Sequence, residues 1–130
     1  MRKLLPAVCG AFVMAASANA ESYGIWSNPS GSVHVEIRDC GDARCASVVW
    51  ANDKAKSDAA KGGTAQLIGT QILRNFRRQE DGRWKGRAFV PDLDRQFTGY
   101  ATILDENTIE VESCVVGRLL CRSQIWTRVP

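Results

Sequence analysis

The stretch that decides the fold runs from Leu73 to Val90 and reads LRNFRRQEDGRWKGRAFV. At its centre, Asp81-Gly82 stands between two alternating segments. This dipeptide is a preferred two-residue type I′ turn, because Asp and Gly tolerate the positive φ that both turn positions need. Such a turn fixes which residues of the two strands face each other. The stretch therefore predicts a β-hairpin whose register follows from its turn.

The predicted register sorts this hairpin into an inner and an outer face. It pairs Arg77 with Gly86 on the inner face and Arg78 with Lys85 on the outer face. A four-residue loop at Pro91–Asp94 would continue the same apolar face, as a correct register should. Gly86 would then lie beside Gly99 and leave room for Trp84 or for a ligand. The predicted inner face consists of Trp84, Ala88, Val90, Phe97, Ala101 and Ile103.

Period-two alternation continues on both sides of this hairpin. Val33, Val35 and Ile37 alternate with polar neighbours, and residues 109–113 follow the same rhythm. Residues 52–66 interrupt it with a polar run, for which we expect a mobile surface loop with at most one helical turn. About eight strands joined by short turns predict an all-β fold, a small antiparallel up-and-down β-barrel without exposed sheet edges. Such a barrel either packs solid or holds one small ligand.

The first 20 residues have the pattern of an export signal. Arg2-Lys3 precede an uncharged, mostly apolar run, and Ala18-Asn19-Ala20 is a small-x-small cleavage site. We expect cleavage after Ala20 and one domain over residues 21–130, periplasmic or secreted; a buried N-terminal helix is the alternative. No later apolar run is long enough for a membrane span. Loss of Arg2 and Lys3 leaves 15 of the 17 basic residues against 14 acidic ones, which excludes a strongly polycationic protein.

Cysteine spacing indicates two local disulfides. Of the five cysteines, Cys9 lies in the expected signal, and the others form two close pairs, Cys40 with Cys45 and Cys114 with Cys121. Four cysteines allow three pairings, between which the sequence alone does not choose. We favour the two local bonds because each would close a hairpin and because exported cysteines are normally oxidised. A four-thiolate zinc site is the alternative, although zinc sites usually use tighter spacings.

A series of different short motifs extends along nearly the whole chain after residue 20. In order, they are Gly24-Ile25-Trp26, the Cys40 and Cys45 pair, Leu67-Ile68-Gly69, Asp81-Gly82-Arg83-Trp84-Lys85-Gly86, Pro91-Asp92 and Gln124-Ile125-Trp126-Thr127-Arg128. Their order and spacing resemble those of secreted bacterial proteins catalogued as domain of unknown function 2147. That family brings no established activity with it.

The two ends of the chain also resemble those of lipocalin-type barrels. Such barrels open with Gly-x-Trp on the first strand and close with an Arg that stacks over that Trp. Trp26 and Arg128 match these positions. The resemblance implies that they close the barrel through a cation–π contact; an ordinary strand start at Trp26 is the alternative.

The sequence contains no catalytic constellation. His34 is the one histidine, and its place on the polar side of its strand predicts a solvated side chain. No serine occupies a nucleophile elbow, and neither a glycine-rich phosphate loop nor a zinc-protease motif occurs. We therefore predict that the protein is not an enzyme and uses no cofactor or metal.

A basic stripe is the most unusual predicted surface feature. It consists of Arg74, Arg78, Arg83, Lys85 and Arg87, which share one predicted face with Phe76 and Phe89. Bases interleaved with aromatics can bind nucleic acid. For an exported protein, an anionic surface, such as lipid headgroups or polysaccharide, or an acidic partner fits such a stripe better. A solvated face without a partner is the interpretation that the sequence favours.

Three functions follow from the sequence, in decreasing order of preference. The first is a binding module for a small, largely apolar ligand, with a wall formed by Trp84, Phe97, Ala101 and Ile103 and with Arg77 at the mouth. The second is a surface interaction or inhibitor protein that acts through the basic stripe or residues 52–66. The third is an enzyme of unrecognised type. The interior discriminates between the first two, because a cavity of several hundred Å³ favours a ligand.

Overall fold

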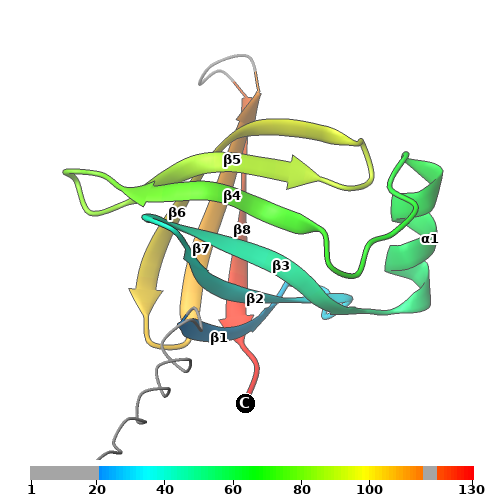
Figure 1. Ribbon diagram of the computed structural model, residues 1–130, viewed down its shortest axis with the longest axis horizontal. Helices are drawn as coiled ribbons and strands as arrows, with labels where there is room; N and C mark the ends of the chain where they lie inside the picture. The colour runs from blue at the N-terminus through cyan, green and yellow to red at the C-terminus, as the bar shows by residue number, and fades with distance from the viewer. Residues whose placement is uncertain (1–20, 116–119) are drawn as a thin grey trace, which may run out of the picture.

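Eight antiparallel strands follow one another around a closed barrel in the computed structural model, which describes residues 21–115 and 120–130. Each strand pairs with the next, and β8 pairs with β1 (Figure 1). The predicted all-β, up-and-down barrel is therefore confirmed. The expected signal, residues 1–20, lies outside the described residues. The elements are β1 (Ser22–Ser27), β2 (Val33–Cys40), β3 (Ala43–Ala51), α1 (Asp53–Lys61), β4 (Gln71–Arg78), β5 (Trp84–Val90), β6 (Arg95–Asp105), β7 (Thr108–Val115) and β8 (Leu120–Arg128).

The barrel has two unlike ends. One end, which we call the hairpin end, carries the tight turns between β2 and β3, β4 and β5, and β6 and β7. The other, which we call the helix end, carries α1 and the loop between β5 and β6 (Figure 1). Because antiparallel strands alternate in direction, successive connections alternate between these two ends.

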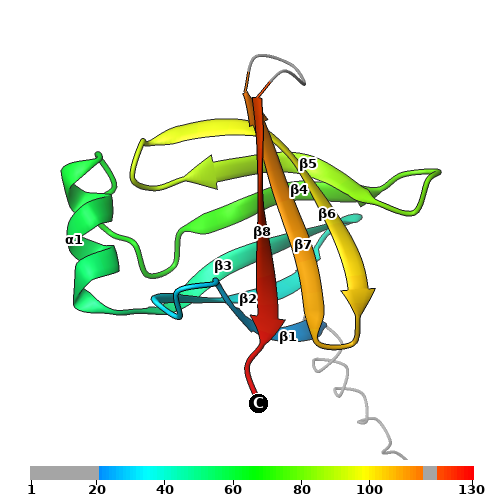
Figure 2. The ribbon, with the colours of Figure 1, turned by 180° about the vertical axis from the view of Figure 1, so that it is seen from behind.

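The seam between β1 and β8 closes the barrel over a short stretch. Its register pairs are Trp26 with Arg128 and Ser27 with Thr127. Figure 2 shows β1 meeting β8 at the end where β8 terminates. Among the described residues, the rest of β8 pairs with β7 alone. Closure therefore depends on a few residues at the two ends of the chain.

The predicted two-residue turn at Asp81-Gly82 is wrong. The Gln79 N–H donates to the Arg83 carbonyl at 2.7 Å, and the Gly82 N–H donates to the Gln79 carbonyl at 3.0 Å. Gly82 has a φ of 88°, which fits a three-residue loop in which a glycine follows a type I turn. The Asp81 carboxylate accepts the Arg83 N–H at 2.9 Å and stabilises this loop. The extra loop residue moves the strand register by one, so that Arg78 pairs with Trp84.

An irregularity at Asn75 changes the hairpin further. Asn75 has a φ of 54°, and the register of β4 with β5 shifts between Arg74 and Arg77. Asn is among the residues that adopt this left-handed conformation most readily. The three-residue turn puts Phe76, which the sequence places outward, into the core, where it is 3% exposed, and the shift at Asn75 returns Arg74 to its predicted outer face. Arg77 pairs with Lys85 instead of Gly86, which corrects its predicted inward position.

The register between β5 and β6 is as predicted. Trp84 pairs with Ala101, Ala88 with Phe97 and Gly86 with Gly99. The space beside the two glycines, however, holds the Phe76 ring and not Trp84. A Cβ at Gly86 would lie 2.6 Å from the Phe76 ring, and one at Gly99 would lie 3.0 Å from it.

Residues 53–61 form a full helix, α1, where a loop with at most one helical turn was expected. Asn52 caps the helix by accepting the Ala55 N–H at 2.8 Å. The helix ends at Gly62, where any Cβ would collide with the backbone of Asp92. The Thr64 hydroxyl also donates to the Pro91 carbonyl at 2.8 Å. These contacts fix α1 against the helix end of the barrel.

Both predicted disulfides, Cys40–Cys45 and Cys114–Cys121, are confirmed. The first joins the ends of β2 and β3, and the second links β7 to β8. Disulfides of this kind persist in oxidising compartments outside the cytoplasm. Within the described residues, no helix has the length and apolar character needed to cross a membrane.

Candidate ligand cavity

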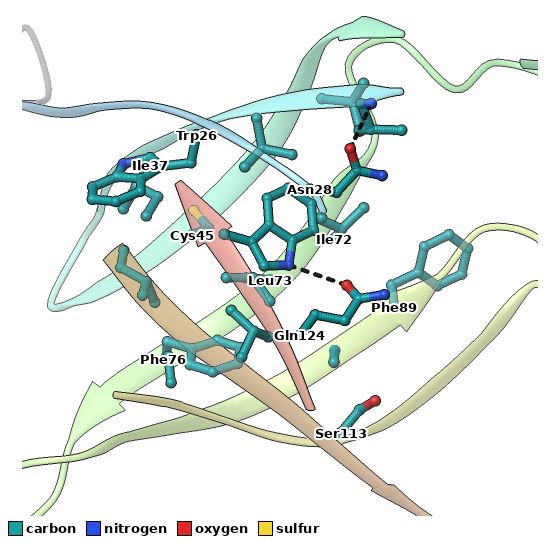
Figure 3. A pocket seen from close by; sticks show the side chains of 18 of the residues that line it. Trp26, Asn28, Ile37, Cys45, Ile72, Leu73, Phe76, Phe89, Ser113 and Gln124 are labelled. Carbon is teal, nitrogen blue, oxygen red and sulfur yellow. Dashed lines mark hydrogen bonds between the residues drawn. The ribbon is translucent and has the colours of Figure 1, made fainter. Parts of the chain in front are cut away.

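A cavity of about 980 Å³ extends through the barrel from the hairpin end to the helix end. Its lining comes from all eight strands and from α1. Figure 3 shows Ile37, Ile72, Leu73 and Phe76 around this space, with Gln124 and Ser113 on another part of the wall. A largely apolar wall with a few polar groups is typical of small-molecule sites, and the volume is at the upper end of their range.

Three of the residues predicted to bind a ligand line this cavity, and two do not. Trp84, Ala101 and Ile103 belong to the lining. Phe97 faces Ala88 across the strands, but it is not one of the lining residues. Arg77 is exposed and lies outside the lining, because the three-residue turn shifts its cross-strand partner from Gly86 to Lys85.

Trp26 and Arg128 lie together where the seam meets the hairpin end. The Arg128 guanidinium is 4.5 Å from the centre of the Trp26 ring. Arg128 also donates to the backbone carbonyls of Glu106 at 2.9 Å and Tyr23 at 3.3 Å. Gly24, which has a φ of 101°, leaves space for the Arg128 side chain, because a Cβ at position 24 would collide with the guanidinium. This contact accounts for the Gly-x-Trp start of β1.

Polar side chains line two other parts of the cavity. On β7 and β8 these are Ser113, Arg122 and Gln124, and the Gln124 side-chain oxygen accepts the Trp126 indole N–H at 3.1 Å. At the helix end, Asn28 accepts the Val33 N–H at 3.0 Å. The pKa of Asp58, which lines the cavity from α1, is lowered by its hydrogen bond from Lys54. A ligand would therefore meet an apolar space with polar groups at its borders.

Arg44, which the sequence analysis did not single out, lines the cavity at the hairpin end. Its guanidinium lies 3.7 Å from the centre of the Tyr23 ring and 4.4 Å from that of Trp84. The Tyr23 hydroxyl donates to Asp39 at 3.0 Å, and this hydrogen bond raises the pKa of Tyr23. The alternation of β3 offered a signal, because Arg44 is in phase with Ala46 and Val48, both fully buried.

The basic stripe is present on the outside of the barrel with a corrected membership. It contains the directly opposed pairs Arg74 with Arg87 and Arg77 with Lys85, and we call these four residues the outer basic face. Arg78 does not belong to it, because Arg78 pairs with the inward-facing Trp84. Arg83 lies at the turn, paired with Asp81 at 3.3 Å and 4.5 Å from the centre of the Tyr100 ring.

His34 lies on the outside of β2, where its ring centre is 4.6 Å from that of Trp50. The pair is a surface contact between neighbouring strands. Because Val33 and Val35 line the cavity on the other side of β2, His34 points away from the cavity.

These features define a small, disulfide-bonded antiparallel β-barrel protein with an internal cavity. The family model described as "Uncharacterized protein conserved in bacteria (DUF2147)" matches residues 24–128. The chain belongs to this family, as its motifs predict. No match was found among the curated proteins or among the solved structures.

Proposed function

We propose that the protein is a binding module that holds a small, largely apolar ligand inside its barrel. The observation that carries this proposal is the cavity of about 980 Å³. A protein that acted only through its surface would have no need of such a space, because natural interiors are close-packed. The function is binding without catalysis.

The proposed location is the periplasm or the extracellular space, after cleavage behind Ala20. Two disulfides support a compartment of this kind. A binding module there would meet ligands that enter from outside the cell or are released from its envelope.

A neutral apolar fluorophore, N-phenyl-1-naphthylamine, tests the proposal. We expect saturable binding with one molecule per chain and a rise in emission as the probe leaves water. Ala88→Leu should weaken binding because Ala88 lines the cavity and is 6% exposed. Arg87→Leu, the matched control on the outer face, should bind as the wild type does. Absence of saturable binding to folded wild-type protein would overturn the proposal.

A second candidate function is binding of an anionic surface or acidic partner to the outer basic face. The observation that favours it is the direct opposition of like charges in two cross-strand pairs, Arg74 with Arg87 and Arg77 with Lys85. Like charges placed this way are destabilising unless something anionic lies near. Within residues 21–115 and 120–130, none of these four bases has an ion-pair partner.

Retention on heparin and on lipopolysaccharide tests this second function. We expect the double variant Arg77→Glu/Lys85→Glu to elute at much lower salt than the wild type. Lys56→Glu/Lys61→Glu, which makes the same charge change on α1, is the control and should elute close to the wild type. Equal losses in both variants would show that net charge alone governs retention and would reject this function.

A further inference from the structure

We propose that the ligand of the cavity carries a carboxylate head group, which binds to Arg44 at the hairpin end while its apolar chain occupies the barrel. This inference rests on the proposed binding function and names the class of ligand. The ligand would be a monocarboxylate with a hydrocarbon chain.

Arg44 is held in place by aromatic rings and not by hydrogen bonds. Its guanidinium lies 3.7 Å from the Tyr23 ring centre on β1 and 4.4 Å from the Trp84 ring centre on β5. Rings stacked on a guanidinium contact its planar faces. The N–H donors lie in the plane and remain able to bond with an anion, and their fork geometry matches a carboxylate.

The charge of Arg44 is only weakly balanced by the protein. The nearest acid is Asp39, with an Oδ1–Nε distance of 3.9 Å, which is too long for a hydrogen bond. That same oxygen already accepts the Tyr23 hydroxyl. In the part of the chain that the structure describes, no side chain or carbonyl accepts a hydrogen bond from the Arg44 guanidinium. Its side chain is 29% exposed, so a ligand can reach the donors that the protein leaves unfilled.

A smaller hollow of about 410 Å³ adjoins the main cavity at this point. The two spaces share Arg44, Trp84 and Ile103. The hollow adds Arg78, which forms no ion pair with any described residue, and Arg83, which pairs with Asp81. An anion in the hollow would meet more positive than negative charge, while the chain attached to it could pass Trp84 and Ile103 into the barrel.

Two other arginines line the same cavity and are weaker candidates. Arg128 donates to two backbone carbonyls and stacks on Trp26, so it already has a structural role. Arg122 lies on the half of β8 away from the seam and is exposed. No aromatic ring among the described residues holds it in place, so binding a ligand there would first require its side chain to be ordered.

Displacement of N-phenyl-1-naphthylamine by dodecanoate and by methyl dodecanoate tests the inference. The two ligands share a chain and differ in charge. In the wild type we expect dodecanoate to bind at least about tenfold more tightly, as charge-assisted hydrogen bonds would give. Arg44→Gln should remove this preference and leave the ester unchanged. Arg87→Gln, on the outer basic face, is the matched control and should keep the preference.

The outcomes separate the head-group inference from the proposed function. Equal binding of both ligands to the wild type would overturn the inference and leave the cavity function intact. Failure of both ligands to displace the bound probe would likewise overturn the inference, whereas failure of the probe itself to bind would reject the cavity function. Loss of the preference in Arg122→Gln, with Arg44→Gln unaffected, would move the site to β8 and overturn the assignment. If Arg44→Gln fails to fold, Arg44→Lys serves instead, because it keeps the positive charge but lacks the forked N–H donors of the guanidinium. This variant should weaken the binding of dodecanoate severalfold and leave the binding of the ester unchanged. Tighter binding of dodecyl phosphate than of dodecanoate would reject the carboxylate.

Discussion

The β1–β8 seam and the β4–β5 hairpin join strands by different means. The seam joins the two ends of the chain through two register pairs, and it is organised by the side chains of Trp26 and Arg128. The hairpin joins neighbouring strands through a local turn, and its register depends on the backbone at Gly82 and Asn75. Side-chain chemistry can be recognised in a sequence over any separation. The backbone conformation of a single residue can decide a strand register, but it is harder to recognise from the amino-acid sequence.

Trp26→Ala should cause the largest loss of stability, because it removes the side chain that organises the seam. Trp26 is 3% exposed, donates its indole N–H to the Tyr23 carbonyl at 3.1 Å and packs under Arg128. Truncation of a buried Trp costs about 3–5 kcal/mol in the free energy of unfolding. Chemical denaturation of the wild type and the variant measures this loss in the free energy of unfolding.

Trp50→Ala is the matched control for the seam. Trp50 is 45% exposed and contacts His34 on the outside of the barrel. Its loss should change the free energy of unfolding by less than about 1 kcal/mol. If the two substitutions were equally mild, the seam would not be what holds the barrel closed.

Gly86→Ala should cause the next largest loss, this time in the hairpin. A Cβ at Gly86 would lie 2.6 Å from the backbone carbonyl of Arg74, and a backbone atom cannot move aside cheaply. We expect a loss of about 1–3 kcal/mol, as for overpacked interiors. Gly99→Ala should cost less, because its closest contacts, at 3.0 Å, are the side chains of Ala88 and Phe76. Equal melting temperatures for the two variants would contradict the close approach of β4 to Gly86.

Most of the fold could be predicted because alternation and turn residues are local signals. The barrel class and the β5–β6 register follow from such signals, and the close spacing of the cysteines favoured the two disulfides that form. The β4–β5 register could not be predicted, because Asp-Gly fits both a two-residue turn and the last two positions of a three-residue turn. One clue was present in the sequence: Phe76 would have been a large apolar residue on a basic face.

The candidate site could be predicted only in part. Trp84, Ala101 and Ile103 were found because they continue an apolar pattern. Arg77 was placed on the wrong face because a change of one residue in the pairing register moves a strand's side chains to the opposite face of the sheet. Arg44 was missed because its role depends on rings from β1 and β5, whereas Arg44 itself lies on β3. The alternation of β3 indicates only that Arg44 faces inward, whereas its contact with rings from two other strands follows from closure of the barrel.

Asn75→Val tests the second irregularity of the hairpin, where the register shifts between Arg74 and Arg77. Asn75 has a φ of 54°, and a β-branched residue is disfavoured there. We expect Asn75→Val to lower the free energy of unfolding by about 1–2 kcal/mol, the usual cost of this conformation. Asn75→Gly should stay within about 0.5 kcal/mol of the wild type, since Gly adopts the conformation freely. If Val were tolerated as well as Gly, β4 would have no left-handed residue at position 75.

The smallest expected effect returns to β1, at the Ser22 end of the seam strand. Glu36 on β2 accepts the Ser22 hydroxyl at 2.6 Å and Arg38 Nε at 3.0 Å, and the hydrogen bond from Ser22 is the main cause that lowers the pKa of Glu36. Because the pKa of Glu36 is lowered in the folded state, its carboxylate stabilises the fold at a pH above the unfolded-state pKa of about 4.3. This contribution to stability is lost as the pH falls through the folded-state pKa. Glu36→Gln should therefore lower the melting temperature by about 1–3 °C at pH 6.5, and this difference should shrink as the pH falls below the unfolded-state pKa. Glu110→Gln is the control, since Glu110 has no ion pair with a described residue. A difference between Glu36→Gln and the wild type that persisted unchanged at acid pH would show that the carboxylate charge does not link β1 to β2.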